Sequence, residues 1–264
     1  LSGKELLHRA RYLKNSGADI IDLGFNEEAP TAVKSAVRLL KKKIDLPVSV
    51  DTIEEKNIKA AFGNADMILS FDSELLQEFS NVTTPSVIRP RRGDLPRAPE
   101  DRIKLLEKNI ELAGRRGFKN IIADLILQPA NLGFANSIIA YKKFSEKHRY
   151  PLLMGAGNVT ELFDADSAGM NALLAAIASE CGASIIFTAE ASDKTRGSVR
   201  ELAAAARMMY LSRLRSSPPK NLGIAVRMRA RPVRVAAAKG ARGWKRGETG
   251  FELLLKYEQM MTVS

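Results

Sequence analysis

The chain has 264 residues, of which 45% are hydrophobic and 27% are charged. This is the composition of a globular protein, and it excludes an intrinsically disordered or collagen-like chain. No apolar run reaches the roughly 18–20 residues that a membrane-spanning helix needs, and the first residues lack the pattern of a signal peptide. One cysteine, Cys181, and two histidines cannot form a disulfide or a structural zinc site. We therefore expect a cytoplasmic protein that does not contact the membrane.

The formal net charge of +11 is concentrated near the C-terminus. Residues 1–210 carry 29 basic and 27 acidic side chains, whereas residues 211–264 carry 12 basic and 3 acidic ones. A basic segment can neutralise phosphates, but Trp244 is the only aromatic residue within this cluster, and single-strand binders usually offer several stacking rings. Residues 216–264 are therefore expected to form a basic tail or the start of a following segment, with nucleic acid the less favoured partner.

A short local pattern recurs along residues 1–215: a Gly or Asn that suits the end of a helix, then an apolar, β-branched run that suits a buried parallel strand. It begins at Gly17, Asn64, Gly117 and Gly182. Similar apolar runs follow at residues 47–50, 85–88 and 150–154. The expected strands begin near Ile20, Val48, Met67, Val87, Ile121, Leu152 and Ile185.

Segments of helical periodicity separate these strands. They span residues 4–15, 32–43, 54–62, 74–79, 100–116, 137–147, 167–180 and 198–211. Regular alternation of strands and helices predicts a parallel sheet, and eight helices with seven strands predict an α/β protein, a TIM (β/α)8 barrel that lacks its first strand at the N-terminus. A doubly wound open sheet is the alternative, although the chain has no Gly-rich G-x-G-x-x-G turn.

In a βα barrel the functional side chains follow the carboxyl ends of the strands. Asp51, Asp124 and Asn158 occupy such positions on separate strands, as do Asp22 and Ser70. Carboxylates accept from N–H donors and an amide both donates and accepts, so this set suits a planar heterocycle with amino and ring N–H groups. For Asp51 a helix N-cap is an almost equally good interpretation.

The last two strands are followed by residues that suit an anion. Gly155 and Gly157 permit a close backbone approach, and Lys194, Arg196 and Ser198 precede or open a helix, where this fold commonly binds phosphate. Tight turns and an ordinary serine cap explain the same residues, and the spacing does not decide between the two.

Four segments resemble the pterin-binding barrels, the family that includes dihydropteroate synthase and the methyltetrahydrofolate-corrinoid methyltransferases. They are residues 17–24 (GADIIDLG), 48–52 (VSVDT), 122–124 (IAD) and 151–162 (PLLMGAGNVTEL). The last is the most specific, and with residues 164–167 it looks like the archaeal and methylotroph dihydropteroate synthase-like proteins. The resemblance covers about residues 3–215.

The resemblance implies a reduced pterin as substrate or coenzyme, held by Asp51 and Asp124, with Asn158 near the ring. Ser70 or Leu69 stands where the family usually has an asparagine. It further implies transferase chemistry in folate- or methanopterin-type coenzyme metabolism, with Mg2+ bound together with a pyrophosphate. It also implies a homodimer and, in the methyltransferase version, a corrinoid protein as partner. A hypothesis of another class is a non-catalytic binding module whose basic tail docks a partner or nucleic acid.

The chain departs from the synthase pattern at three places. Residues 25–30 replace the loop of the aminobenzoate site, residues 156–158 replace the Ser-x-Lys motif, and residues 188–190 replace Arg-x-His. Lys194 and Arg196 would then supply charge to a pyrophosphate. The resemblance therefore favours pterin binding more than it favours the synthase reaction, and it identifies no catalytic residue.

Overall fold

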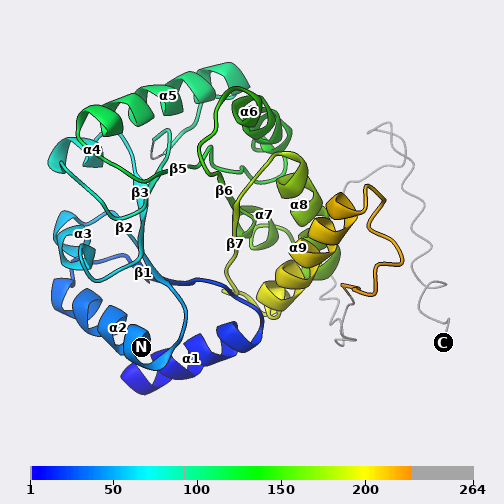
Figure 1. Ribbon diagram of the computed structural model, residues 1–264, viewed down its shortest axis with the longest axis horizontal. Coiled ribbons are helices and arrows are strands. Elements are labelled where there is room, and N and C mark those ends of the chain that lie inside the picture. The colour runs from blue at the N-terminus through cyan, green and yellow to red at the C-terminus, as the bar shows by residue number, and fades with distance from the viewer. Residues whose placement is uncertain (1, 92, 227–264) are drawn as a thin grey trace, which may run out of the picture. The chain divides into compact units, whose positions relative to one another are not determined.

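The computed structural model describes residues 2–91 and 93–226, which belong to one compact unit. Its strands lie inside a ring of helices (Figure 1). The strands are β1 (Ile21–Phe25), β2 (Val48–Thr52), β3 (Met67–Phe71), β4 (Ser86–Ile88), β5 (Ile121–Ala123), β6 (Leu153–Gly155) and β7 (Ile185–Phe187). Each expected strand is present: the pattern of a helix-ending residue followed by an apolar run located four of them, and the short apolar runs alone located the other three.

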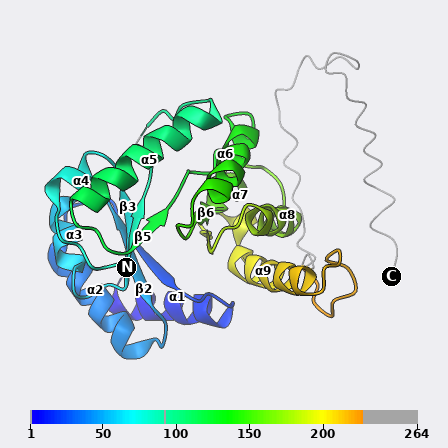
Figure 2. The same ribbon diagram turned by 45° about the horizontal axis from the view of Figure 1, so that its top comes forward.

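The helices alternate with the strands and cover the outside of the sheet (Figure 2). They are α1 (Gly3–Asn15), α2 (Pro30–Lys43), α3 (Glu55–Ala61), α4 (Leu75–Glu78), α5 (Pro99–Arg115), α6 (Phe134–Lys147), α7 (Gly157–Thr160), α8 (Ser167–Glu180) and α9 (Ser198–Leu214). The sequence analysis missed the single-turn helix α7. Its residues, GNVT, carry no apolar periodicity from which a helix is predicted.

All strand pairings are parallel. Strands β1 to β5 form one sheet in chain order and β6 pairs with β7, while a bridge between Ala123 and Leu152 continues the arrangement from β5 to β6. The α/β TIM-type fold predicted from the sequence is confirmed, and the doubly wound alternative is not. No described strand pairs with the outer edges of β1 and β7, so the barrel is not closed.

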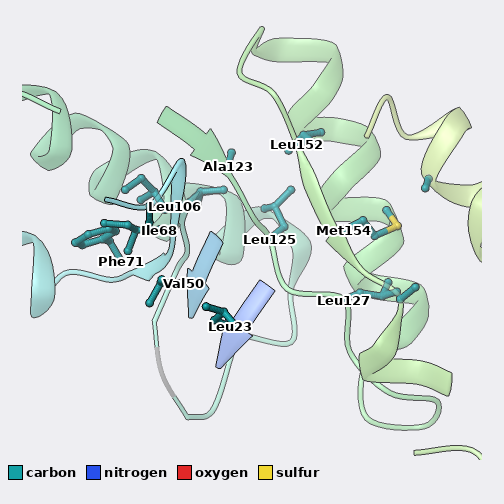
Figure 3. Close-up of a cluster of buried hydrophobic side chains, with 14 of the residues drawn as sticks. Leu23, Val50, Ile68, Phe71, Leu106, Ala123, Leu125, Leu127, Leu152 and Met154 are labelled. Carbon is teal, nitrogen blue, oxygen red and sulfur yellow. The ribbon is translucent and has the colours of Figure 1, made fainter. Parts of the chain in front are cut away.

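Strand alternation sorts the apolar side chains into two cores. The larger core lies between sheet and helices and includes Leu23, Val50, Ile68 and Phe71 (Figure 3). The smaller core faces the barrel interior and contains Met67, Leu69, Val87, Ile122 and Leu153. Because the interior core is apolar, polar side chains on the inner face are confined to the strand ends, which is where the site lies.

The C-terminal part of the unit continues beyond the expected barrel boundary at residue 215. Leu222 is 9% exposed and Val226 packs against the larger core. The rest of the predicted basic tail, from residue 227 onward, lies outside the described residues. None of the described helices combines the length and the apolarity needed to cross a bilayer.

Candidate functional site

Four charged side chains gather at the carboxyl ends of the strands. Val87 and Ile122 belong to the interior core, and Arg89 and Asp124 follow them at the next position on the same face. Asp51 is the register partner of Leu69, another interior residue. Asp22 lies on β1, beside its register partner Ser49 on β2. Asp22 lies two register positions before Asp51, with which it interacts electrostatically, and Arg89 interacts with both Asp51 and Asp124.

Asp22 is the most clearly perturbed acid of this group. Burial raises its pKa to about 6, and the nearby carboxylate of Asp51 contributes to the increase. The Ser49 hydroxyl donates a hydrogen bond of 2.5 Å to Asp22 Oδ1, which partly offsets the effect of burial. An acid whose pKa lies near 6 in a concave interior is typical of functional sites.

Asp22→Asn is expected to stabilise the protein at neutral pH. The folded-state pKa of about 6 exceeds the ordinary value of 3.8, so the folded state holds the Asp22 proton more tightly than the unfolded state does. The free energy of unfolding therefore falls as pH rises from about 4 to about 6, and Asn removes this dependence. Denaturant titration should show the variant gaining about 2 kcal/mol relative to wild type between pH 4.5 and pH 7.5.

Asp101→Asn is the matched control, because its side chain on α5 is 62% exposed. Its stability relative to wild type should change little between the two pH values. Equal pH dependence for Asp22→Asn and Asp101→Asn would contradict a buried, perturbed Asp22.

The Asp51 carboxylate and the Arg89 Nε atom have no hydrogen-bond partner among the described residues. Burial raises the pKa of Asp51, while the Arg89 guanidinium lowers it, and no described residue donates a hydrogen bond to this carboxylate. Arg89 Nη2 lies 3.3 Å from Asp72 Oδ2, yet its buried Nε has no acceptor among the described residues. A buried donor and a buried acceptor therefore remain available to a ligand.

The N-cap interpretation of Asp51 does not fit the structure. Helix α3 begins at Glu55 with Glu54 as its N-cap residue, and the Glu54 amide donates to Thr52 Oγ1 at 3.2 Å. The Asp51 carboxylate takes no part in this turn, so its place at the mouth of the interior needs another explanation.

Asp124 is held by a buried tyrosine from α6. The Tyr141 hydroxyl lies 2.5 Å from Asp124 Oδ1 and 3.0 Å from the Leu153 carbonyl, and the Ile126 amide donates to the same carboxyl at 2.8 Å. A tyrosine has one hydroxyl proton, so it cannot donate to both acceptors. The shorter contact assigns the Tyr141 proton to Asp124 Oδ1, and burial raises the pKa of Asp124.

Arg102 of α5 fixes the segment that follows Asp124. It is fully buried, and its guanidinium donates to the carbonyls of Ile126 and Pro96, each at 3.1 Å, and to the Gln128 side chain. The sequence analysis missed Arg102, Tyr141 and Ser49. Strand alternation would have shown that Ser49 shares a face with Asp51, whereas the two helix residues carry no local signal.

Asn158 and Ser70 lie near the mouth but outside the charged group. Asn158 is an exposed residue of α7 whose Nδ2 donates to the Leu127 carbonyl at 3.0 Å. Ser70 is 9% exposed in β3, where the register with β4 shifts between Ile68 and Phe71. No described hydrogen bond joins either side chain to the acidic residues.

The cations expected to bind phosphate are paired with acidic side chains of the protein. Lys194 Nζ lies 2.9 Å from Asp164 Oδ1, and Arg196 Nη2 lies 2.9 Å from Asp193 Oδ1. Glu161 accepts hydrogen bonds from Ser192 and Thr195 and so ties the same loop to α7. In these ion pairs the positive charges of Lys194 and Arg196 are balanced by acidic side chains of the protein itself.

The N-terminus of α9 already carries a carboxylate. Glu190 Oε1 accepts a hydrogen bond from the Val199 amide at 3.1 Å, and Glu190 Oε2 accepts from the Tyr12 hydroxyl at 3.0 Å and lies 3.6 Å from Arg9. Gly197 is the N-cap residue, so Ser198 does not cap this helix. An internal acid thus stands where this fold commonly holds a phosphate.

The two glycines of this region serve internal packing. A Cβ on Gly157 would lie 3.3 Å from the Ala189 amide nitrogen, and one on Gly155 would lie 3.2 Å from Asn158 Nδ2. Within residues 2–91 and 93–226 no three His, Cys, Asp or Glu side chains are grouped closely enough to hold a metal ion.

Comparison with known proteins adds a sequence relative of undetermined function. No protein-family model matches the chain. An uncharacterised protein of Methanocaldococcus jannaschii, MJ0107, is 43% identical over 236 residues. The match covers 84% of this chain but only 45% of that protein, so the chain spans less than half the length of its relative.

Solved structures with a similar fold include enzymes of two kinds. Dihydropteroate synthase of Coxiella burnetii, in complex with pteroic acid, has a TM-score of 0.64 at 20% identity, with 81% of this chain and 86% of that chain covered. Dihydropteroate synthase of Xanthomonas albilineans, in complex with 7,8-dihydropteroate, has a TM-score of 0.63 at 16% identity, with coverages of 82% and 89%.

A truncated 3-deoxy-D-arabino-heptulosonate 7-phosphate synthase of Thermotoga maritima has a TM-score of 0.60 at 14% identity, with coverages of 82% and 84%. The two kinds of enzyme carry out different reactions on one fold, so the fold by itself does not select a substrate. The chain has the TIM-type α/β fold that dihydropteroate synthases share with this second synthase.

Proposed function

We propose that this protein binds a reduced pterin at the carboxyl ends of its strands and carries out transferase chemistry on it. The observation that carries the proposal is the group of three partly buried acids, Asp22, Asp51 and Asp124, each with a raised pKa, of which Asp51 interacts electrostatically with both others. Desolvation of an acid is costly to a fold, and a ligand that supplies N–H donors offsets the cost.

The polar groups at the mouth match the edge of a pterin ring. An amino group and a ring N–H present adjacent donors, which the carboxylates of Asp51 and Asp124 accept. The unpartnered Arg89 Nε would donate to a ring carbonyl or ring nitrogen. Asn158 is near enough to the mouth to contribute an amide, and its exposure leaves it able to change rotamer. The likeness to dihydropteroate synthases supports this ligand class.

The loops favour a pterin that carries no pyrophosphate. Lys194 and Arg196 are paired with Asp164 and Asp193, and Glu190 holds the N-terminus of α9. A pyrophosphate would have to displace these acids, and Glu190 would repel it. The observation favours methyl transfer from a methyltetrahydropterin, with a corrinoid protein as acceptor, over the synthase reaction.

Calorimetric titration with reduced pterins tests the proposal. Tetrahydrofolate and tetrahydromethanopterin represent the two coenzyme types, and 6-hydroxymethyl-7,8-dihydropterin is compared with its pyrophosphate ester. We expect saturable binding of the reduced ring and a gain of less than about threefold from the pyrophosphate, because Lys194 and Arg196 are already paired with acids.

Two results would contradict these proposals separately. A gain of about tenfold or more from the pyrophosphate would overturn the preference for methyl transfer while leaving the pterin site in place. Failure of every pterin to bind a folded sample of the full-length protein would overturn the pterin site itself.

A further inference from the structure

Ile126 has a backbone conformation that its side chain disfavours. Its φ is +62°, in the left-handed region, where a β-branched residue is an outlier because its side chain crowds the backbone. The other described non-glycine residues with positive φ are small and polar: Asn81, Asn131, Ser216 and Asn221. Asparagine tolerates this region because its short side chain forms local hydrogen bonds. The need for a turn therefore does not explain why position 126 is an isoleucine.

Hydrogen bonds to both of its peptide groups hold Ile126 in this conformation. The Ile126 amide donates to Asp124 Oδ1 at 2.8 Å, and the Ile126 carbonyl accepts from Arg102 Nη1 at 3.1 Å. Asp124 is fixed in turn by the Tyr141 hydroxyl, and Gln128 accepts from the same Arg102 guanidinium. An unfavourable backbone conformation persists where its surroundings over-determine it, and such residues cluster at functional sites. Arg102 and Tyr141 thus support a strained residue beside the candidate site.

The Ile126 side chain lies apart from both hydrophobic cores. Its neighbours Leu125 and Leu127 are fully buried in the larger core (Figure 3). Ile126, between them, is only partly buried and belongs to neither the larger core nor the interior core. Its amide bonds directly to the Asp124 carboxyl group. An apolar side chain is therefore left partly exposed next to an acid of the candidate site.

A planar ligand needs such an apolar surface. The N–H donors and the acceptors of a heterocycle lie in the plane of its ring, so Asp51, Arg89 and Asp124 can meet only the edge of the ring. The two faces of the ring carry no hydrogen-bonding groups, and ligand pockets cover such faces mostly with apolar side chains. A partly exposed isoleucine beside Asp124 supplies a surface that the charged side chains lack.

We propose, on the basis of the pterin-binding function proposed above, that Ile126 packs against one face of the bound ring, and that Asp124 and Arg102 hold it in the left-handed conformation that presents it there. The ligand-free protein then keeps an unfavourable conformation whose benefit appears only when the ligand binds. A residue better suited to this backbone should make the protein more stable and its binding weaker. A residue with a merely structural role behaves differently, because its replacement lowers stability and affinity together.

Ile126→Asn separates these two roles. Asn accommodates the left-handed region but offers no apolar surface, so we expect the thermal midpoint of unfolding to rise by about 2–4 °C. Calorimetric titration should show affinity falling about tenfold for both tetrahydrofolate and 6-hydroxymethyl-7,8-dihydropterin. The second ligand consists of little beyond the ring, so an equal loss for both places the contact on the ring.

Two further variants complete the experiment. Ile126→Val keeps a β-branched apolar side chain and should bind both pterins within about threefold of wild type. Ile139→Asn is the matched control, since Ile139 is a 43% exposed residue of α6. The control should leave pterin affinity unchanged and should not raise the thermal midpoint.

The outcomes distinguish this role of Ile126 from the pterin site itself. If wild type and Ile126→Asn bind the pterins equally well, the role of Ile126 is overturned while the pterin site stands. An unchanged or lower thermal midpoint for Ile126→Asn would also overturn it, because the conformation would then carry no strain that Asn relieves. If wild type binds neither pterin, the proposed function fails and the role of Ile126 fails with it.

Discussion

Replacing Asp124 with Asn is expected to weaken binding of a reduced pterin by about 10- to 100-fold, since a hydrogen bond to a charged group contributes about 1.5–3 kcal/mol. Asn keeps the shape of the side chain and still accepts from the Ile126 amide, but its Nδ2 opposes a ring N–H donor instead of accepting from it. The measurement is the calorimetric titration of wild type and variant under one set of conditions.

The fold should tolerate this change. The Oδ1 atom of Asn can still accept from the Tyr141 hydroxyl and from the Ile126 amide, so the hydrogen bonds that hold this side chain are kept. Asp45→Asn serves as the control and should bind like wild type, because Asp45 is exposed and precedes the amino end of β2, away from the carboxyl ends of the strands. Unchanged pterin affinity in a folded Asp124→Asn protein would remove Asp124 from the site.

Replacing Arg102 with Met is expected to lower the free energy of unfolding by about 3 kcal/mol, the largest stability effect among these predictions. Met preserves much of the aliphatic length, but it leaves the buried carbonyls of Ile126 and Pro96 without their donor. An unsatisfied buried acceptor costs about 1–3 kcal/mol. Denaturant titration of the purified variant measures the loss.

Arg115→Met on the same helix is the matched control. The Arg115 side chain is 62% exposed and pairs with Glu111 one helical turn away, so its loss should cost less than about 0.5 kcal/mol. Similar stabilities for the two variants would show that the buried guanidinium does not hold the loop. Because Arg102 fixes the segment after Asp124, we also expect its replacement to weaken pterin binding.

The sequence was sufficient for the order of strands and helices because the information is local. A residue such as Gly17 or Gly182, with φ of +99° and +72°, ends a helix, and the β-branched run after it forms a buried strand. Period-two alternation then fixes which side chains share a face. The positions of Asp51 and Asp124 at the strand ends follow from these local rules together with the parallel direction of the sheet.

The availability of charged groups could not be read from the sequence. Lys194 and Arg196 are residue types typical of a phosphate-binding site, but in the folded chain Lys194 pairs with Asp164, 30 residues away. The Glu190 side chain contacts Tyr12, 178 residues away, and takes the helix N-terminus that a phosphate would need. Such pairings depend on which distant loops come together in the folded protein, and the spacing of residue types along the chain does not reveal this.

Local sequence patterns determined the elements, their parallel order and the acids at the strand ends, because backbone conformation and strand alternation depend on near neighbours. The tertiary structure decided which acids have a raised pKa, and it decided that Tyr141 and Arg102 support Asp124 and the segment after it. Desolvation and long-range hydrogen bonds exist only in the folded protein, because both require segments far apart in sequence to pack together and exclude water.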